Sequence, residues 1–269
     1  MADFIHYHKR VVNLRPRKSE PKTSEFEWAH QPQSKGAGFT APAFHITRSP
    51  HGPAARIKVG DTIWHFARLH SSRHSADVAL DAKIVVEKVT PRPDGPGFRY
   101  QAGQGSCWFA LFNPGEIFNN LKTLDATGKI SNLLSRTDQP PGQAMQQIRE
   151  ILDPAPLHDQ ERRISDAETH FISYRHKGGL AHAFAKCRAL VGDDRAVWWD
   201  RWSLPRRLAE RREKVSNRAL DSRIRQQLLA SDVVWGIETK RYKEAGCYAL
   251  KEKRLAKKYV KYCPVIIQE

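Results

Sequence analysis

The residues best placed to carry chemistry in this sequence are polar side chains that follow three apolar runs in its C-terminal part. These polar segments are Ser173–His176, Asp200–Pro205 and Glu238–Tyr242. They supply hydroxyl, guanidinium and carboxylate groups, which bind phosphates and stabilise developing positive charge. Because ligands of a parallel α/β sheet bind outside the carboxyl ends of its strands, we expect these segments to surround one site.

Histidine and cysteine spacing does not predict a metal site. The nearest candidates, His65, His70 and His74, are loosely spaced and have no Cys or carboxylate at ligand spacing nearby. The four cysteines lie far apart and form no CxxC pair, which argues against a zinc ribbon and a disulfide framework. They are Cys107, Cys187, Cys247 and Cys263. We therefore expect no metal, no resident cofactor and a reducing, cytoplasmic location.

The composition favours a chain of about two domains with anionic partners. The 269 residues include 45 Lys and Arg and 29 Asp and Glu, giving a net charge of +16. The N-terminus lacks the apolar core of a signal peptide, and no window approaches the ~18 consecutive apolar residues of a membrane helix. We expect no contact with a membrane.

The apolar runs belong to a series of alternating strands and helices over residues 166–269. Strands are predicted at 169–174, 195–199, 231–237 and 263–268, and helices at 180–191, 216–230 and 245–259. Apolar strands separated by helices form βαβ units, which build a parallel, doubly wound sheet. The sequence therefore predicts an α/β domain here.

Four of these segments resemble motifs of TIR (Toll/interleukin-1 receptor) domains. Phe171–Arg175 is similar to the first box, and Trp198–Asp200 with the turn to Pro205 resembles the second strand and its loop. Tyr248–Glu252 resembles the aromatic-x-x-Lys-Glu segment that carries the catalytic glutamate in NAD-cleaving members, and Cys263–Ile267 is similar to the next strand. The resemblance covers about residues 168–269 and implies a flavodoxin-like sheet. The sequence departs from the TIR pattern in two ways. Residues 205–231 are longer and more basic than the family's usual second helix, and the sheet is expected to have fewer strands than in many TIR domains.

The resemblance implies cleavage of the nicotinamide–ribose bond of NAD, with Glu252 as the catalytic residue. Nicotinamide leaves as a neutral base, so the group to be stabilised is the oxocarbenium-like ribose, and a carboxylate does this in glycoside hydrolysis. Water attacks next, or the substrate's own adenine where a cyclic product forms. Tyr174, Arg175, Trp202 and Tyr248 would bind the substrate, with the guanidinium on the pyrophosphate and the indole as a stacking surface.

Each assignment has a structural alternative. Glu252 could be a surface residue near a helix start, and Arg175 could pair with Asp166 or Glu168. Tyr174 could be core packing. At least one of the adjacent residues Trp198 and Trp199 is core, because neighbours on a strand point to opposite faces.

The N-terminal part is predicted to be β-rich. Residues 1–55 read as a largely irregular arm, 56–136 as a β-rich recognition domain and 137–165 as a linker with a short helix over 144–152. The segments Lys58–Phe66 and Leu80–Val86 faintly resemble PUA-like small barrels, which implies a nucleic-acid or nucleotide ligand. The aromatic side chains expected either to form a base-stacking cage or to pack in the core are Trp64, Tyr100, Trp108 and Phe109.

The resulting hypothesis is an NAD glycohydrolase in a sensor–effector protein of immunity, such as antiphage defence by NAD depletion or a cyclic ADP-ribose signal, active as a homo-oligomer. One alternative is a non-catalytic TIR adaptor, which would not need a carboxylate at position 252. Another is a nucleic-acid-binding module with strongly salt-dependent affinity. The nucleic-acid alternative depends on two basic runs. Residues 201–225 contain nine basic and three acidic residues, and residues 251–261 contain six basic residues and one acidic residue. Both runs could equally be solvated helix faces.

Overall fold

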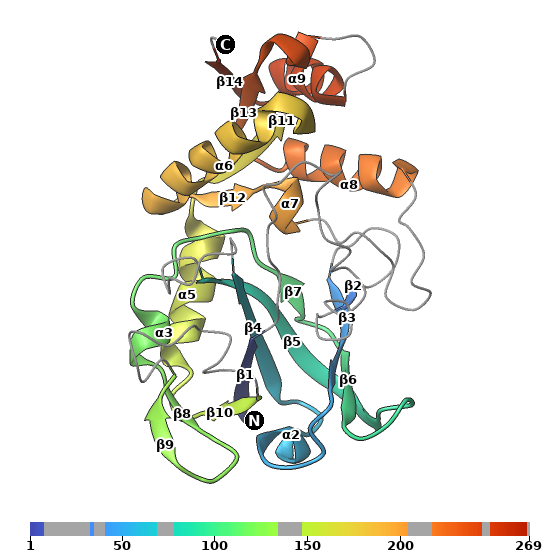
Figure 1. The fold of residues 1–269 in the computed structure, drawn as a ribbon, viewed down its shortest axis with the longest axis vertical. Helices are drawn as coiled ribbons and strands as arrows, with labels where there is room; N and C mark the ends of the chain where they lie inside the picture. Colours follow the sequence, from blue (N-terminus) through green and yellow to red (C-terminus); the bar gives the residue numbers. More distant parts are fainter. Residues whose placement is uncertain are drawn as a thin grey trace.

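The chain folds into two packed parts, each built on a sheet. The computed structural model describes residues 1–7, 33–34, 41–68, 78–133, 147–203, 217–243 and 248–267. A large mixed sheet forms the lower part of Figure 1, and a four-stranded parallel sheet with its helices forms the upper part. The prediction of an α/β protein is confirmed.

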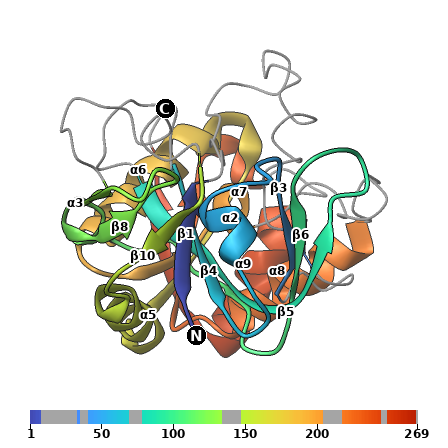
Figure 2. The ribbon, with the colours of Figure 1, turned by 90° about the horizontal axis from the view of Figure 1, so that it is seen from below.

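The large sheet consists mostly of antiparallel neighbours. Its strands are β1 (Asp3–Tyr7), β2 (Gln33–Ser34), β3 (Pro42–Thr47), β4 (Thr62–Arg68), β5 (Val78–Pro91), β6 (Phe98–Ala102), β7 (Cys107–Trp108), β8 (Lys122–Leu124), β9 (Ile130–Asn132) and β10 (Arg149–Ile151). Their order is β2-β3-β6-β5-β4-β1-β10-β8-β9, with β7 paired to β5. Among the described strand pairs of this sheet, only β1 and β4 run parallel. Seen from below, the sheet curves from β3 and β6 on one side to β8 on the other, with β1 and β4 between them (Figure 2).

Successive side chains along a strand point to opposite faces of this sheet, and apolar side chains are buried on both faces. In β4, Ile63 packs in one apolar cluster, and Trp64 and Phe66 pack in another on the opposite face. Helix α5 (Ala155–Asp166) covers the Trp64 face with Leu157 and Ile164. Two short helices, α2 (Pro53–Arg56) and α3 (Ile117–Asn120), complete this part. The two apolar clusters, one on each face of the sheet, form the core of the lower part and hold its strands in position.

The N-terminal residues contribute strands, which corrects the prediction of a largely irregular arm over 1–55. Strand β1 lies between β4 and β10, and its Phe4 and Ile5 are each 1% exposed. Strand β3 pairs with β6. These strands have five and six residues, too few to show a period in the sequence, and pairing with neighbours stabilises them. Residues 8–32 and 35–40 lie outside the described part.

The predicted linker over 137–165 is also corrected. Residues 149–151 form β10, paired with β1 and β8, where a helix over 144–152 was expected. The burial of both Ile148 and Ile151 explains the helix-like spacing of apolar residues. The helix begins instead at Ala155 and packs into the core. Residues 134–146 lie outside the described part.

The upper part is a four-stranded, all-parallel sheet. Its strands β11 (Thr169–Tyr174), β12 (Ala196–Trp198), β13 (Val233–Glu238) and β14 (Lys261–Ile266) lie in the order β12-β11-β13-β14. The connections contain α6 (His176–Gly192), α7 (Asp200–Ser203), α8 (Asn217–Leu229), the 3-10 helix η3 (Lys240–Lys243) and α9 (Tyr248–Tyr259). Leu180 and Cys187 of α6 pack on one face, while Leu228 of α8 and Ala256 of α9 pack on the other. The predicted strands and helices of this region are confirmed.

The two parts share a core. Leu111 and Val197 exchange two backbone hydrogen bonds of 2.9 and 2.8 Å, which join the loop after β7 to β12. Ala67 and Leu111 pack in the same apolar cluster as Ile172. The lower part is therefore joined to the upper sheet at β12, its edge strand.

Candidate active site

The candidate site is centred on a hydrogen bond between Ser173 and Glu252. Ser173 is the fifth residue of β11 and is 1% exposed, and Glu252 is the fifth residue of α9. The Ser173 hydroxyl donates to Oε2 of Glu252 over 2.5 Å. Alternation places Ser173 on the face covered by α9, because Phe171, two residues earlier, packs with Ala256. The strand and the helix thus bring together two of the segments that the sequence singled out.

Glu252 has the electrostatic surroundings of a functional carboxyl. Burial is the main cause that raises its pKa to about 7; the hydrogen bond from Ser173 acts against the rise, and the negative charges of Asp200 and Asp221 add to it. At neutral pH the group is therefore divided between its acid and its carboxylate. A pKa near neutrality in a polar cluster is typical of catalytic carboxyls, although structural clusters also show it.

Two tyrosines complete the polar cluster around Ser173. The Tyr242 hydroxyl lies 3.1 Å from Oγ of Ser173 and donates to the backbone oxygen of Ala249 at 3.0 Å. Burial raises the pKa of Tyr242 to about 12, and it also raises the pKa of Tyr262, whose hydroxyl lies 3.5 Å away. Both phenols stay protonated under physiological conditions. Tyr242 links Ser173 to the start of α9, and Tyr262 links Tyr242 to Glu238.

A second glutamate next to the site has a different environment. Glu238, at the end of β13, accepts hydrogen bonds from Lys253 Nζ at 2.6 Å and from the Tyr262 hydroxyl at 2.7 Å. Its charge is therefore compensated by a cation, whereas Glu252 faces other carboxyl groups. The two carboxyls therefore lie in contrasting environments, and Glu252 is the one whose pKa is raised toward neutrality.

Gly236 makes the close packing of this cluster possible. It lies opposite Ser173 in the register of β11 and β13. A Cβ atom at Gly236 would lie 1.9 Å from the hydroxyl oxygen of Tyr262. Only glycine leaves room for that phenol, so Gly236 belongs to the site although it bears no chemistry. A glycine inside the apolar run VVWGIE was the available sequence signal for this close approach, and neither Gly236 nor Tyr262 was predicted.

The other predicted site residues occupy different positions. Tyr174 points to the opposite face of the sheet, is 8% exposed and donates to Oδ1 of Asp200 at 2.7 Å. Trp202 is fully buried in the core with Trp199, so the prediction that its ring offers a stacking surface is corrected. Arg175 lies directly before α6 and is partly exposed. Tyr248 is 41% exposed at the start of α9.

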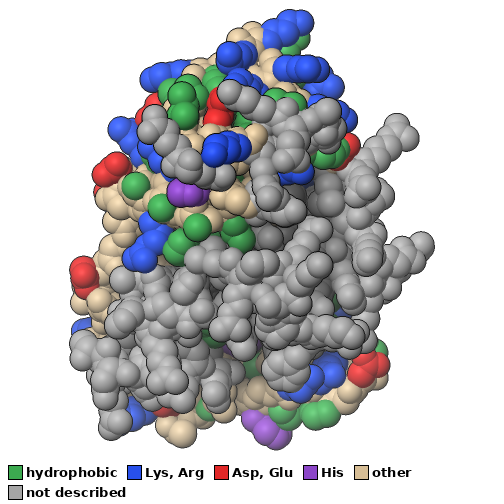
Figure 3. Space-filling view, turned by 45° about the horizontal axis from the view of Figure 1, so that its top comes forward, with side chains coloured by type: hydrophobic (Ala, Val, Ile, Leu, Met, Phe, Trp, Pro, Cys, Tyr) green, Lys and Arg blue, Asp and Glu red, His purple; other side chains and the backbone are tan. Residues whose placement is uncertain are grey.

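The basic run on α9 turns its charges outward. Its exposed basic residues are Lys251, Arg254, Lys257, Lys258 and Lys261, and Figure 3 shows Lys and Arg side chains spread over the upper part of the molecule. Glu252, the one acidic residue of the run, turns inward to Ser173. Of the other run, 201–225, residues 204–216 lie outside the described part.

The predicted aromatic cage of the N-terminal part is not formed. Trp64 and Tyr100 are fully buried in two different clusters on opposite faces of the sheet, and Phe109 is 7% exposed. Their hydrophobic surface is used for packing, which is the alternative that the sequence left open. Trp64 and Phe109 stack on each other within one cluster, Tyr100 lies in the other, and Trp108 is only partly buried, so the four rings do not surround a base.

His65 has partners that its sequence surroundings do not reveal. His6 and His45 lie beside it, and the candidate ligand atoms of the three all lie within 4.8 Å of one another. The spacing around His65 does not show these two histidines, because they come from strands distant in sequence. His70 and His74 lie outside the described residues.

A cavity of about 90 Å³ lies between the two parts of the molecule. It is lined by Asp81 and Trp108 from the lower part and by Thr169, Arg223 and Ser231 from the upper part. Thr169 begins β11, so the cavity lies at the opposite end of that strand from Ser173. Glu252 does not line it, and the cavity is separate from the candidate active site.

Comparisons of the chain with protein-family models, with curated proteins and with solved structures find no match. No helix among the described residues is both long and apolar enough to cross a membrane.

Proposed function

We propose that the upper part is a TIR-like NAD glycohydrolase in which Glu252 is the catalytic carboxylate. The observation that carries the proposal is the Glu252 carboxyl, held by Ser173 at the carboxyl end of a parallel strand, with burial raising its pKa to about 7. In the proposed reaction the C1′–N bond breaks and its electron pair leaves with nicotinamide. The carboxylate stabilises the cationic ribose, and water adds at C1′ with release of one proton to give ADP-ribose. Attack by the substrate's adenine nitrogen gives a cyclic product instead.

The order of the strands supports this proposal. Numbered along the chain, β12-β11-β13-β14 is 2-1-3-4, which agrees with the first four strands of a flavodoxin-like sheet. In that fold the ligand binds at the carboxyl edge between the first and third strands. Ser173 and Gly236 face each other across β11 and β13 at this end of the sheet.

The chemistry of the surrounding residues gives each a role in the proposal. Arg175 precedes α6 on the same strand end and would bind the pyrophosphate. Ser173 fixes the carboxyl by donating a hydrogen bond to Oε2. Tyr174 acts through Asp200, whose carboxylate it orients. Tyr248 has exposed surface beside the first turn of α9 and would contact the substrate.

The biological role that we propose is that of an effector in immunity that works by self-association. Assembly of copies would complete the pocket, and the β-rich part would carry the recognition that triggers assembly. The depletion of NAD or a cyclic signal would then be the output.

The test is release of nicotinamide from NAD by the purified full chain, alone and concentrated by a crowding agent. We expect wild type to release nicotinamide and Glu252→Gln to lose at least about a hundredfold in rate, the usual cost of removing one electrostatic stabiliser. The matched control is Glu87→Gln, the same change at an exposed position of β5.

Two outcomes would replace this function by the alternatives. Concentration-dependent assembly without release, equal in wild type and Glu252→Gln, would indicate a non-catalytic adaptor. Tight binding of DNA or RNA with a steep salt dependence, unchanged by Glu252→Gln, would indicate a nucleic-acid-binding module.

A further inference from the structure

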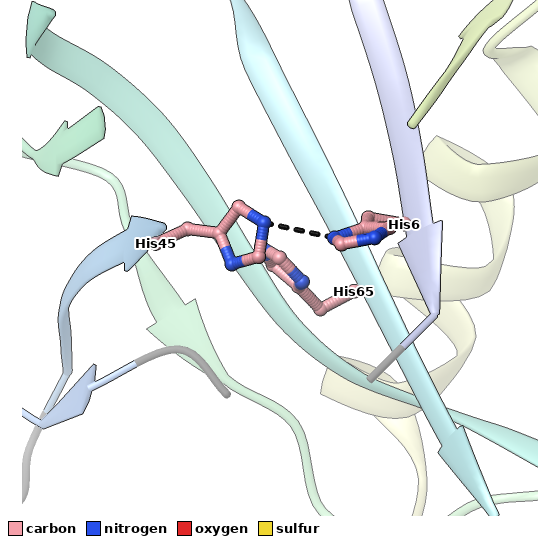
Figure 4. Close-up of side chains that lie close together, drawn as sticks. All are labelled: His6, His45 and His65. Carbon is pink, nitrogen blue, oxygen red and sulfur yellow. Dashed lines mark hydrogen bonds between the residues drawn. The ribbon is translucent and has the colours of Figure 1, made fainter. Parts of the chain in front are cut away.

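Three buried histidines meet inside the large sheet. They come from three strands, His6 from β1, His45 from β3 and His65 from β4, and are 6%, 0% and 0% exposed. Figure 4 shows the three rings converging, with Nδ1 of His6 and Nε2 of His45 2.8 Å apart. The ring centroids of His45 and His65 are 4.5 Å apart.

The backbone presents these side chains from fixed positions. His6 and His65 are direct partners in the parallel pairing of β1 and β4. Alternation places them on the same face as Phe4 and Ile63, which pack in one apolar cluster with Tyr100. His45 reaches them from β3, three strands away from β4 along the sheet, because the sheet curves. The convergence is therefore a product of the fold and not of local sequence.

The geometry points to a binding site for one zinc ion, or a similar borderline divalent transition-metal ion, held by His6, His45 and His65. Three neutral imidazoles are the protein ligands of known His₃ zinc sites, which leave a fourth position for water or another donor. The three ligand atoms are imidazole nitrogens, which suit Zn²⁺ and similar ions, whereas Mg²⁺ and Ca²⁺ prefer oxygen ligands.

Small movements convert the cluster into a coordination shell. Zinc–nitrogen bonds of about 2.0–2.1 Å in a tetrahedron separate two ligand nitrogens by roughly 3.3 Å. The structure has one pair at 2.8 Å and all candidate ligand atoms within 4.8 Å, so each ring needs to shift by about 1 Å or less. The proton shared by His6 and His45 then moves to an outer ring nitrogen, so that both facing nitrogens offer lone pairs.

The ion would link strands that do not pair with each other. Strands β1 and β3 are separated by β4, β5 and β6 in the sheet, and the His6–His45 contact joins them across its concave side. A metal at this point ties the N-terminal strand to the opposite side of the curved sheet. Because the ligands come together only in the folded chain, metal binding would stabilise the fold.

The experiment uses the untagged full chain, stripped of metal with a chelator and then titrated with ZnCl₂. We expect one equivalent of Zn²⁺ to bind and the midpoint of thermal unfolding to rise by several degrees. His45→Phe keeps an aromatic ring of similar size but removes the ligand, so it should bind zinc at least about tenfold more weakly and lose the thermal shift. His182→Phe, at an exposed position of α6, is the matched control and should behave as wild type.

Absence of zinc binding by wild type, or equal binding by wild type and His45→Phe, would overturn the proposal. If His45→Phe fails to fold, X-ray absorption of zinc-loaded wild type still identifies the ligand atoms and their distances from the ion. Three imidazole nitrogens at about 2.0–2.1 Å support the site, and a shell containing sulfur or only oxygen refutes it.

Discussion

Replacing Glu252 by Gln should stabilise the protein at alkaline pH, although it removes the proposed catalytic group. The carboxyl has an ordinary pKa of 4.5 and a folded-state pKa of about 7, because it is buried beside other carboxyl groups. Between these two values the folded state binds more protons than the unfolded state, so stability falls as the pH rises. The contribution of the protonated carboxyl is complete below pH 4.5 and is lost above about pH 7.

The size of the change in folding free energy follows from the shift in the pKa of Glu252. A rise of about 2.5 pH units, at about 1.4 kcal/mol per unit, is about 3 kcal/mol of folding free energy. Because Glu252 is only partly buried by surface area, solvent screening makes this an upper bound. An uncharged Gln avoids the cost, and at about 2–4 °C per kcal/mol the melting temperature of Glu252→Gln should exceed that of wild type by several degrees at pH 8.5.

The assay is thermal unfolding of wild type and Glu252→Gln at a series of pH values from 4.5 to 8.5. Other groups titrate in both proteins, so the difference between the two melting temperatures isolates Glu252. We expect a small difference at pH 4.5 that grows through pH 7 and then levels off. Glu87→Gln, at an exposed position, serves as the control and should give a small, flat difference. A flat difference for Glu252→Gln as well, or one that favours wild type at pH 8.5, would show that the Glu252 carboxyl does not have a raised pKa in the folded protein.

Three further changes test the surroundings of the site. Ser173→Ala removes a hydrogen bond that favours the ionised carboxyl, so the pH midpoint of NAD cleavage should move upward from about 7 in a rate–pH profile; an unchanged or lower midpoint would contradict the role of Ser173. Gly236→Ala drives a methyl group into the Tyr262 hydroxyl and should lower both the melting temperature and the cleavage rate, whereas Ala at the exposed Gly192 should do neither. Leu111→Ala should destabilise the chain by about 2–5 kcal/mol in denaturant unfolding, because Leu111 packs in the core shared by the two parts, and a loss below about 1 kcal/mol would show that the parts are not coupled there.

The C-terminal elements could be predicted because their signals are local. The runs THFISY and VVWGIE each form one buried strand, and Leu180 and Cys187 recur at helical spacing on one face of α6. Polar residues after parallel strands were expected to meet at one edge of the sheet, and Ser173 and Tyr242 do lie in contact there. Local pattern and the general geometry of parallel sheets were sufficient for this part.

The remaining features depend on contacts between distant residues. The convergence of His6, His45 and His65 requires the register of β1 on β4 and the curvature of the sheet. Neither of these can be predicted from a short stretch of sequence. Strand β10 formed in place of the predicted helix because β1 and β8 offer it backbone partners on both sides. Trp202 looked available as a stacking surface after a strand, yet tertiary packing buries it.

The catalytic role of Glu252 is tested by the ratio of nicotinamide release by wild type to that by Glu252→Gln, at pH 8 and at a protein concentration where copies assemble. Wild type should release nicotinamide from NAD, and the variant, folded and at least as stable, should be slower by about a hundredfold or more. Equal rates in the two proteins, or no release by assembled wild type, would contradict the assignment of Glu252 as the catalytic carboxylate.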